Sequence, residues 1–440
     1  MSTLAPPSGS GATELPQHQA SRRSPFSSTT LNVLAAAAFA IAAMVWLVAG
    51  ARLPGGRWLA VHLFTLGVLS NAVWGFSRHF AHRLTAPPAS DRLRAPLVVV
   101  FNLGVLVMLT GVAQGVTLAI GVGAAATTAV VLAGWWHLRG RRKAAPDTRF
   151  AWIVRVYERA HGAFVHGAVL GTLLGLGLLP AGWYGAARDA HLHVMVLGWG
   201  GLTLAATLVF FGPSLLRTRM EDGADERAAR ALPWGASALT VAVIALLLGG
   251  LGGLAGRVSA ILAAVGLGVF TWAVLSATRP VLRAAASAKP YVARGPVIGV
   301  CIWLPTALVL DVAGVALGQR QWLEAAGIIL LVGALGQAVL AVLLYLTPML
   351  RGATFAAREH WQQRTLRFAA PRAFVLNIGV AVVGVAATLG PAAGAGGALV
   401  VRVGWTAIAL GVVAHLLVFL WPTSGTPLEV SEVVARRREA

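Results

Sequence analysis

Residues 190–213 read AHLHVMVLGWGGLTLAATLVFFGP, and the pattern at the start of this apolar stretch occurs twice more in the chain. Aligned on its glycine, HVMVLG at residues 193–198 matches HLFTLG at 62–67 and IILLVG at 328–333. Two copies begin with histidine, and the third begins with isoleucine. One helix is therefore written three times, which indicates a fold built from repeats.

The spacing between the copies is that of a four-helix unit. The glycines that close them are 131 and 135 residues apart. Prolines that precede the following helix recur 137 and 138 residues apart, at Pro96, Pro233 and Pro371. We predict three homologous repeats, at residues 30–143, 144–289 and 290–422. Because four is even, each repeat begins and ends on the same side of a membrane, so the repeats are parallel about the membrane normal.

The composition excludes a water-soluble domain. Of 440 residues, 57% are hydrophobic and only 11% are charged, and no soluble fold hides that much apolar surface. Apolar runs of about 20 residues cross a hydrocarbon core of roughly 30 Å as helices. The sequence therefore predicts an all-α polytopic membrane protein with about twelve transmembrane helices. We place them at residues 31–50, 57–78, 95–114, 116–138, 151–179, 189–212, 232–253, 257–277, 293–317, 322–347, 370–393 and 397–421.

The net charge of +20 could suggest a nucleic-acid partner, so the placement of the charges decides. With the N-terminus in the cytoplasm, 29 of the 35 Lys and Arg fall in cytoplasmic segments, which is the positive-inside bias. No basic surplus is left that needs nucleic acid to explain it. We expect both termini in the cytoplasm, a disordered tail at residues 1–29, a second tail at 423–440, and the lipid bilayer as the main partner.

Ionisable residues inside a bilayer are costly, so each is a candidate for function. His62 and His193 lie at matching depth near the outer end of the second helix of a repeat. Neutral imidazole binds haem iron and copper, and these two residues are the first candidates for haem or metal ligands. The alternative is a helix-end histidine at the outer membrane interface.

His191 precedes His193 by two residues, which places the two side chains about 200° apart on a helix. Only one of them would then face a given ion. Asp189 is four residues before His193, so its side chain could accept a hydrogen bond from that ring and fix its orientation.

The fifth predicted helix carries His161 and His166, which lie about 140° apart around the helix. His166 is near the middle of the span and is a candidate ligand or proton carrier, with a packing role as the alternative. Glu158 could pair with His161 or with a neighbouring arginine, or belong to a charge cluster at the inner interface. Asp311 is the only acid deep in a span, and it is a candidate proton or cation carrier. Two further histidines near helix ends are expected at the interface: His137 and His415.

Twelve helices in three arcs, with imidazoles on the second helices, resemble the catalytic subunit of haem-copper oxidases and nitric oxide reductases. The resemblance implies a haem ligand at His62 and a copper ligand at His193. It also implies further histidines on the seventh and tenth helices. The tenth helix has Ile328 instead, and the seventh has no histidine, so an active terminal oxidase is not expected.

The run His191-Leu192-His193-Val194-Met195, followed by Gly198 and Pro213, is similar to the NnrS family of divergent twelve-helix haem and copper proteins. It also resembles the membrane portions found beside actinobacterial multicopper oxidases. A cluster of histidine and methionine suits copper. This resemblance implies a bacterial inner (plasma) membrane and a multicopper oxidase or another redox protein as partner.

Together these observations predict a membrane protein of haem-copper-oxidase-like fold that binds haem, copper or both. Its predicted role is redox, nitric oxide or copper handling. The alternative is a metal-free transporter or a structural membrane protein in which Asp311 and the membrane histidines form polar contacts.

Overall fold

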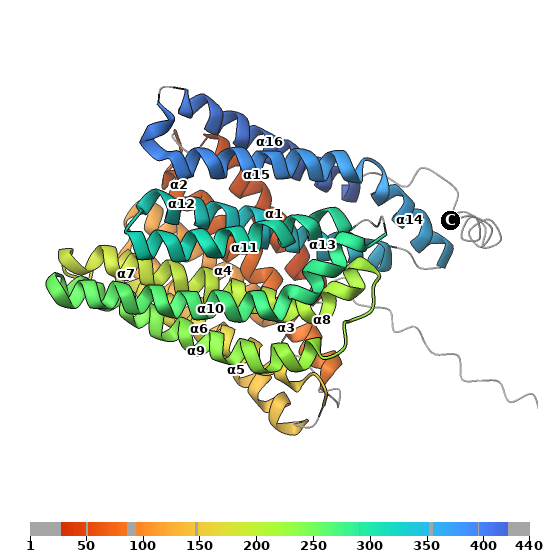
Figure 1. Ribbon diagram of the computed structural model, residues 1–440, viewed down its shortest axis with the longest axis horizontal. Coiled ribbons are helices and arrows are strands. Elements are labelled where there is room, and N and C mark those ends of the chain that lie inside the picture. Colours follow the sequence, from red (N-terminus) through yellow and green to blue (C-terminus); the bar gives the residue numbers. More distant parts are fainter. Residues whose placement is uncertain are drawn as a thin grey trace, which may run out of the picture.

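The computed structural model describes residues 28–49, 52–85, 94–145, 148–289, 291, 293–351, 355–394 and 396–420. Figure 1 shows them as a bundle of long helices that run alongside one another, and no strand occurs in this part of the chain. The two predicted tails lie outside the described residues, except that Ser28 and Thr29 begin the first helix.

The elements follow the three predicted repeats. The first contains α1 (Ser28–Ala49), α2 (Gly56–His62), η2 (Leu63–Leu69), α3 (Ser70–Leu84), α4 (Arg94–Gln114) and α5 (Thr117–Ala144). The second contains α6 (Ala151–Gly175), α7 (Ala181–His193), η3 (Val194–Gly201), α8 (Leu202–Leu216), α9 (Ala224–Leu248), η4 (Gly249–Leu251) and α10 (Gly253–Ser287). The third contains α11 (Arg294–Leu317), α12 (Arg320–Ile328), η5 (Ile329–Gly336), α13 (Gln337–Arg351), α14 (Phe355–Leu366), α15 (Ala369–Leu389), η6 (Gly390–Ala393) and α16 (Gly397–Leu420).

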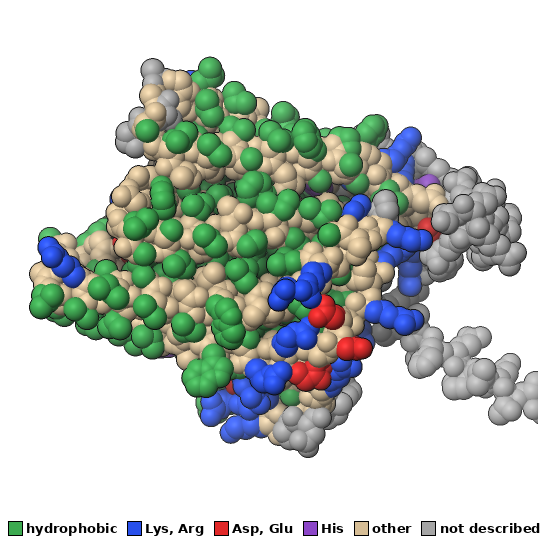
Figure 2. Space-filling view, viewed as in Figure 1, with side chains coloured by type: hydrophobic (Ala, Val, Ile, Leu, Met, Phe, Trp, Pro, Cys, Tyr) green, Lys and Arg blue, Asp and Glu red, His purple; other side chains and the backbone are tan. Residues whose placement is uncertain are grey.

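Within the described residues, ten helices are long and apolar enough to cross a membrane. Figure 2 shows the side of the bundle covered by hydrophobic side chains, with the Lys, Arg, Asp and Glu side chains gathered towards one end. The chain is therefore a multi-pass membrane protein. The first and fifth predicted spans coincide with α1 and α6, which are not among the ten, so the count of twelve stays a prediction.

The predicted spans overlap these helices, but some ends differ. The span predicted to end at residue 277 continues as helix α10 to Ser287. Arg279 and Arg283 lie in this extension and are exposed. Charge ends a membrane span, but it does not end a helix, because arginine is a good helix former. The short helix α14 was not predicted, because it carries no apolar run.

The three copies of the quoted pattern share an unusual backbone. Each second helix changes from α-helix to π-helix in mid-course, at η2, η3 and η5. The residue just before each π-helix is the first residue of the pattern: His62, His193 or Ile328. Short π-helical segments occur mostly where function or packing requires them.

The glycine of each copy lets a side chain from the first helix of the same predicted repeat approach the backbone. The pairs are Phe39 on Gly67, Ala163 on Gly198 and Trp303 on Gly333. A Cβ at these glycines would lie only 2.2, 2.7 and 2.7 Å from the nearest of those side-chain atoms. Close approach of helices at small residues is the main source of packing in membranes, which explains why the glycine recurs.

Four residues after the glycine, a second helix bonds to the third helix of its unit. In the first unit the Asn71 amide donates to Asn102 Oδ1 over 2.7 Å, and the Asn102 amide donates back over 3.1 Å. In the third unit the Gln337 amide donates to Asn377 Oδ1 over 2.9 Å. The second unit has two buried leucines at the matching positions, Leu202 and Leu239. The two positions therefore change together, either both polar or both apolar.

This pairing predicts a compensating double substitution. Replacing Asn71 or Asn102 alone with leucine should lower the free energy of unfolding by about 1 kcal/mol, because the remaining amide loses its partner. Replacing both copies the leucine pair of the second unit and should restore most of that loss. Unfolding in detergent, analysed as a double-mutant cycle, measures the coupling. Two single losses that simply add in the double variant would contradict the pairing.

Candidate functional site

The three π-helices meet near the middle of the bundle. The indole Nε1 of Trp199 in η3 donates to Ser70 Oγ, just after η2, over 3.1 Å. Leu335 of η5 packs on Gly200 of η3, and Phe64 of η2 packs on Gly336 of η5. The second helices of the three predicted repeats therefore surround a common axis, and the histidines just before them lie at one end of this core.

His62, the last residue of α2, is held by the turn that precedes it. Its Nδ1–H donates to the Trp58 carbonyl oxygen over 2.8 Å, since a carbonyl can only accept. The indole of Trp58 stacks on the imidazole with ring centroids 4.0 Å apart. The ring is half-buried, and its Nε2 carries the free lone pair, because Nδ1 holds the proton.

His191 has the same arrangement in the second predicted repeat. Its Nδ1–H donates to the Gly167 carbonyl oxygen of α6 over 2.8 Å, which leaves Nε2 as the lone-pair nitrogen. The ring lies over Gly171, where a Cβ would be 2.7 Å from Cε1, and the Met195 side chain lies over Gly167. The two glycines, four residues apart, make room for an imidazole and a thioether side by side.

His62 and His191 are close enough for the charge of one ring to act on the other. The structure thus brings together an imidazole from α2 and an imidazole from α7. The sequence paired His62 with His193, but in the structure the partner of His62 on this helix is His191. The spacing of Gly167 and Gly171 was a signal for this site, because two small residues four apart open one face of a helix.

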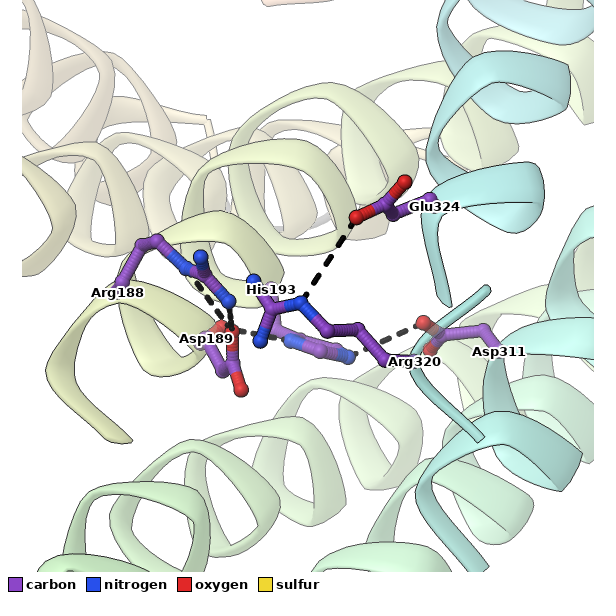
Figure 3. A network of polar contacts seen from close by, with 6 residues as sticks. All are labelled: Arg188, Asp189, His193, Asp311, Arg320 and Glu324. Carbon is purple, nitrogen blue, oxygen red and sulfur yellow. Dashed lines mark hydrogen bonds and ion pairs between the residues drawn. The ribbon is translucent and has the colours of Figure 1, made fainter. Parts of the chain in front are cut away.

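His193 points instead to the third predicted repeat, as Figure 3 shows. Its Nδ1–H donates to the Asp189 carbonyl oxygen over 2.7 Å, and its Nε2 lies 3.1 Å from Oδ1 of Asp311 on α11. His193 and Asp311 are only 2% and 7% exposed. Because Nδ1 already carries a proton, the contact between Nε2 and Asp311 holds one further proton, shared between a base and an acid.

These contacts correct two predictions. Asp311 is not an isolated carboxylate, because it pairs with His193 across 118 residues of sequence. Asp189 does hold the His193 ring, but through its backbone carbonyl and not its side chain. The Asp189 carboxylate pairs with Arg188 over 2.8 Å. Arg320 and Glu324 of α12 form a further pair nearby in Figure 3, with N and O atoms 3.8 Å apart.

His161 lies apart from these residues, in the interior of the bundle. Its Nδ1–H donates to the Tyr157 carbonyl oxygen over 2.8 Å, and its fully buried Nε2 has no hydrogen-bond partner. Its ring packs edge-on against Trp199, with centroids 4.8 Å apart. The contacts of His191 begin six residues further along α6, roughly 9 Å away at 1.5 Å per residue. One ion cannot bind both residues.

The other two candidates on α6 do not join the site. His166 is exposed on the helix surface and is brought to neither His62 nor His193. Glu158 is buried, but its predicted partners were wrong, because its carboxylate accepts from Arg142 of α5 over 2.6 Å. This contact belongs to a charge cluster at the helix ends.

Two histidines expected at the interface have other surroundings. His415 on α16 is buried, with 1% exposure, and its Nδ1–H donates to the Gly411 carbonyl oxygen over 2.7 Å. The interfacial assignment of His415 was therefore wrong. The Nε2 atoms of His137 and His82 lie 3.2 Å apart, a contact between α5 and α3 that the sequence did not suggest.

In the part of the chain that the structure describes, no three His, Cys, Asp or Glu side chains lie close enough together to hold one metal ion. A metal at His62 and His191 would therefore draw its remaining ligands from methionine, from a macrocycle or from an exogenous molecule.

Comparison with known proteins adds no assignment: no protein-family model matches the sequence, and neither does any curated protein.

Proposed function

We propose that this membrane protein binds copper or haem through His62 and His191 and acts in redox, nitric oxide or copper handling. The observation that carries the proposal is the matched state of these two rings. Each has its Nδ1–H tied to a backbone carbonyl, so each offers Nε2. Metal-binding histidines almost always donate their other ring N–H in this way, since the bond fixes both tautomer and orientation.

The residues present fit either group. Two imidazoles are the axial ligand set of many haems, and two imidazoles with the neighbouring Met195 thioether are a soft set that suits copper. His193 fits less well as a ligand, because both of its nitrogens already have partners. The geometry therefore favours His191 as the ligand on the sixth predicted span.

At this site the chain itself would hold and shield the bound group. A bound haem or copper ion supplies one-electron chemistry and an affinity for nitric oxide. Trp58 covers one face of the His62 ring and limits the approach of water. The sequence has no histidine between residues 194 and 359, so the histidine set of a terminal oxidase is incomplete. We therefore propose binding or electron transfer, not oxygen reduction, with a multicopper oxidase or another redox protein as partner.

The test is cofactor content in variants that remove one ligand each. His62→Ala and His191→Ala should each abolish the haem absorption bands or the bound copper of the purified protein, because one imidazole alone holds either group weakly. His166→Ala is the matched control, since His166 is an exposed histidine of the same bundle, and it should keep the full cofactor content. Wild-type protein without haem or copper after growth with both would refute the proposal.

A second variant moves His191 without removing it. Alanine at Gly171 would place Cβ 2.7 Å from the imidazole Cε1, so the ring must shift and its bond to the Gly167 carbonyl must weaken. Copper affinity should fall about tenfold or more, as for the loss of an orienting contact. Gly162→Ala is the control, because a Cβ there meets no atom within 4 Å. Equal copper affinity in the two variants would remove His191 from the site.

The buried pair of His193 and Asp311 favours a second candidate, a metal-free proton-coupled transporter. A shared proton between two spans is the usual equipment of such carriers. Proton uptake by vesicles containing the protein would test it, with Asp311→Asn as the variant that leaves no titratable carboxyl group. Proton-coupled flux that disappears in this variant, in a protein without haem or copper, would favour transport over redox function.

A further inference from the structure

A pocket of about 360 Å³ opens at one end of the bundle, between the third predicted repeat and α2. It lies where α2, α12 and α16 begin and where α15 ends. These ends are opposite the segment after α5 and the basic end of α10. Its lining residues are Arg57, Arg320, Gln321, Glu324, Ile328, Val383, Ala387, Gly390, Val401 and Trp405.

The polar part of the lining carries excess positive charge. Arg57 and Arg320 are both exposed, and Glu324 lies 3.8 Å from Arg320. Glu324 balances one of the two guanidinium charges. Arg57 forms no ion pair with any carboxylate of the described residues. One net positive charge therefore remains at the rim of the pocket, where an anion would complete it.

The rest of the pocket is apolar. Ile328 of α12, Val383 and Ala387 of α15, and Val401 and Trp405 of α16 contribute aliphatic and aromatic surface. Ile328 stands at the position of the histidines in the other two copies, so the polar site of those repeats is replaced here by hydrocarbon. A small hydrated anion gains nothing from such a surface, whereas an acyl chain does.

The position in the fold joins these two halves. The pocket is at the ends of membrane-spanning helices, so its charged rim lies at the level of lipid headgroups and its apolar part faces the hydrocarbon region. Basic pockets between transmembrane helices that sit at headgroup depth bind anionic lipid headgroups. Of the lining helices, α16 is covered least by protein, since only 17% of its apolar window is buried, and lipid has direct access along it.

We propose that this pocket binds one anionic phospholipid, with the phosphate between Arg57 and Arg320 and an acyl chain along Ile328, Ala387 and Trp405. The site is separate from His62 and His191 and does not depend on the proposed cofactor.

Native mass spectrometry of the full chain in detergent, titrated with phosphatidylglycerol or phosphatidylcholine, tests the proposal. One phosphatidylglycerol should bind at least tenfold more tightly than phosphatidylcholine. The double variant Arg57→Gln with Arg320→Gln should lose this preference. The matched control is Arg402→Gln, an exposed arginine of α16 that does not line the pocket, and it should keep the preference.

A third variant examines the apolar half. Ala387→Trp fills the pocket without changing charge and should weaken phosphatidylglycerol binding about tenfold, while the melting temperature shows that the fold is kept. Inorganic phosphate at millimolar concentration should not displace the lipid. Equal binding of the two lipids, or an unchanged preference in the double arginine variant, would overturn the proposal. So would displacement by phosphate together with normal binding to Ala387→Trp, because the site would then be one for free phosphate.

Discussion

Replacing Asp311 with leucine is expected to lower the free energy of unfolding by about 3 to 5 kcal/mol, the range for breaking a buried pair by removing one partner. The loss arises because His193 stays buried with its Nε2 facing a hydrocarbon side chain. Chemical unfolding of the purified protein in detergent measures the change. It should be among the largest single-residue effects in the bundle, since few other ionisable side chains are buried between two spans.

Two companion variants separate the pair from its volume. Asp311→Asn keeps the shape and an oxygen that can accept from Nε2–H, so its loss should be about 1 kcal/mol. Leucine at both His193 and Asp311 removes the unpaired group and should recover much of the single-variant loss. If Asp311→Leu were as stable as wild type, the close contact between α7 and α11 would not be a stabilising one.

The second large effect is expected at Gly67, the glycine of the first copy of the pattern. A Cβ there would lie 2.2 Å from Cγ of Phe39 and 2.5 Å from its Cβ. Because the Phe39 Cβ is itself in the way, rotating the ring cannot make room, and α1 must move away from η2. Gly67→Ala should cost about 1 to 3 kcal/mol by overpacking, measured by the same unfolding experiment.

The Phe39 background shows whether the cause is steric. When Phe39→Ala is already present, the further change Gly67→Ala should cost almost nothing, which a double-mutant cycle reports as strong coupling. Gly121→Ala in α5 is the matched control, since a Cβ there meets no atom within 4 Å. It should be neutral or slightly stabilising, because alanine is the better helix former. A cost at Gly67 that does not depend on Phe39 would contradict this explanation.

Much of the fold could be predicted from the sequence, because hydropathy and helix length report the same property. Each predicted span overlaps a helix of the structure, and the aligned glycines do lie at equivalent contacts. The π-helices could not be predicted, since no residue type specifies them and the surrounding side chains are ordinary helix formers. The extra helical length of α10 was missed because the limit of a membrane span was taken as the limit of the helix.

The candidate site was predicted only in part. His62 and His191 were both recognised as candidates, but the sequence could not show which histidine of α7 faces α2, because the two differ only by rotation about the helix axis. Asp311 was recognised as the one deep acid, but its partner lies 118 residues away, and no local spacing indicates such a contact. The asparagine pair was half visible: Asn102 and Asn377 recur at a fixed distance, whereas Asn71 and Gln337 differ in type.

The π-helical segments also constrain how the chain can change in length. Each contains one residue more per turn than an α-helix needs, so the residues on its two sides differ in rotational phase by about 100° from a continuous α-helix. Deleting one residue within Leu63–Leu69 would let the segment return to α-helix and would turn His62 about a quarter of a turn relative to Asn71. Single-residue deletions elsewhere in a loop are harmless by comparison. The three second helices should therefore be the parts of this protein least tolerant of insertions and deletions.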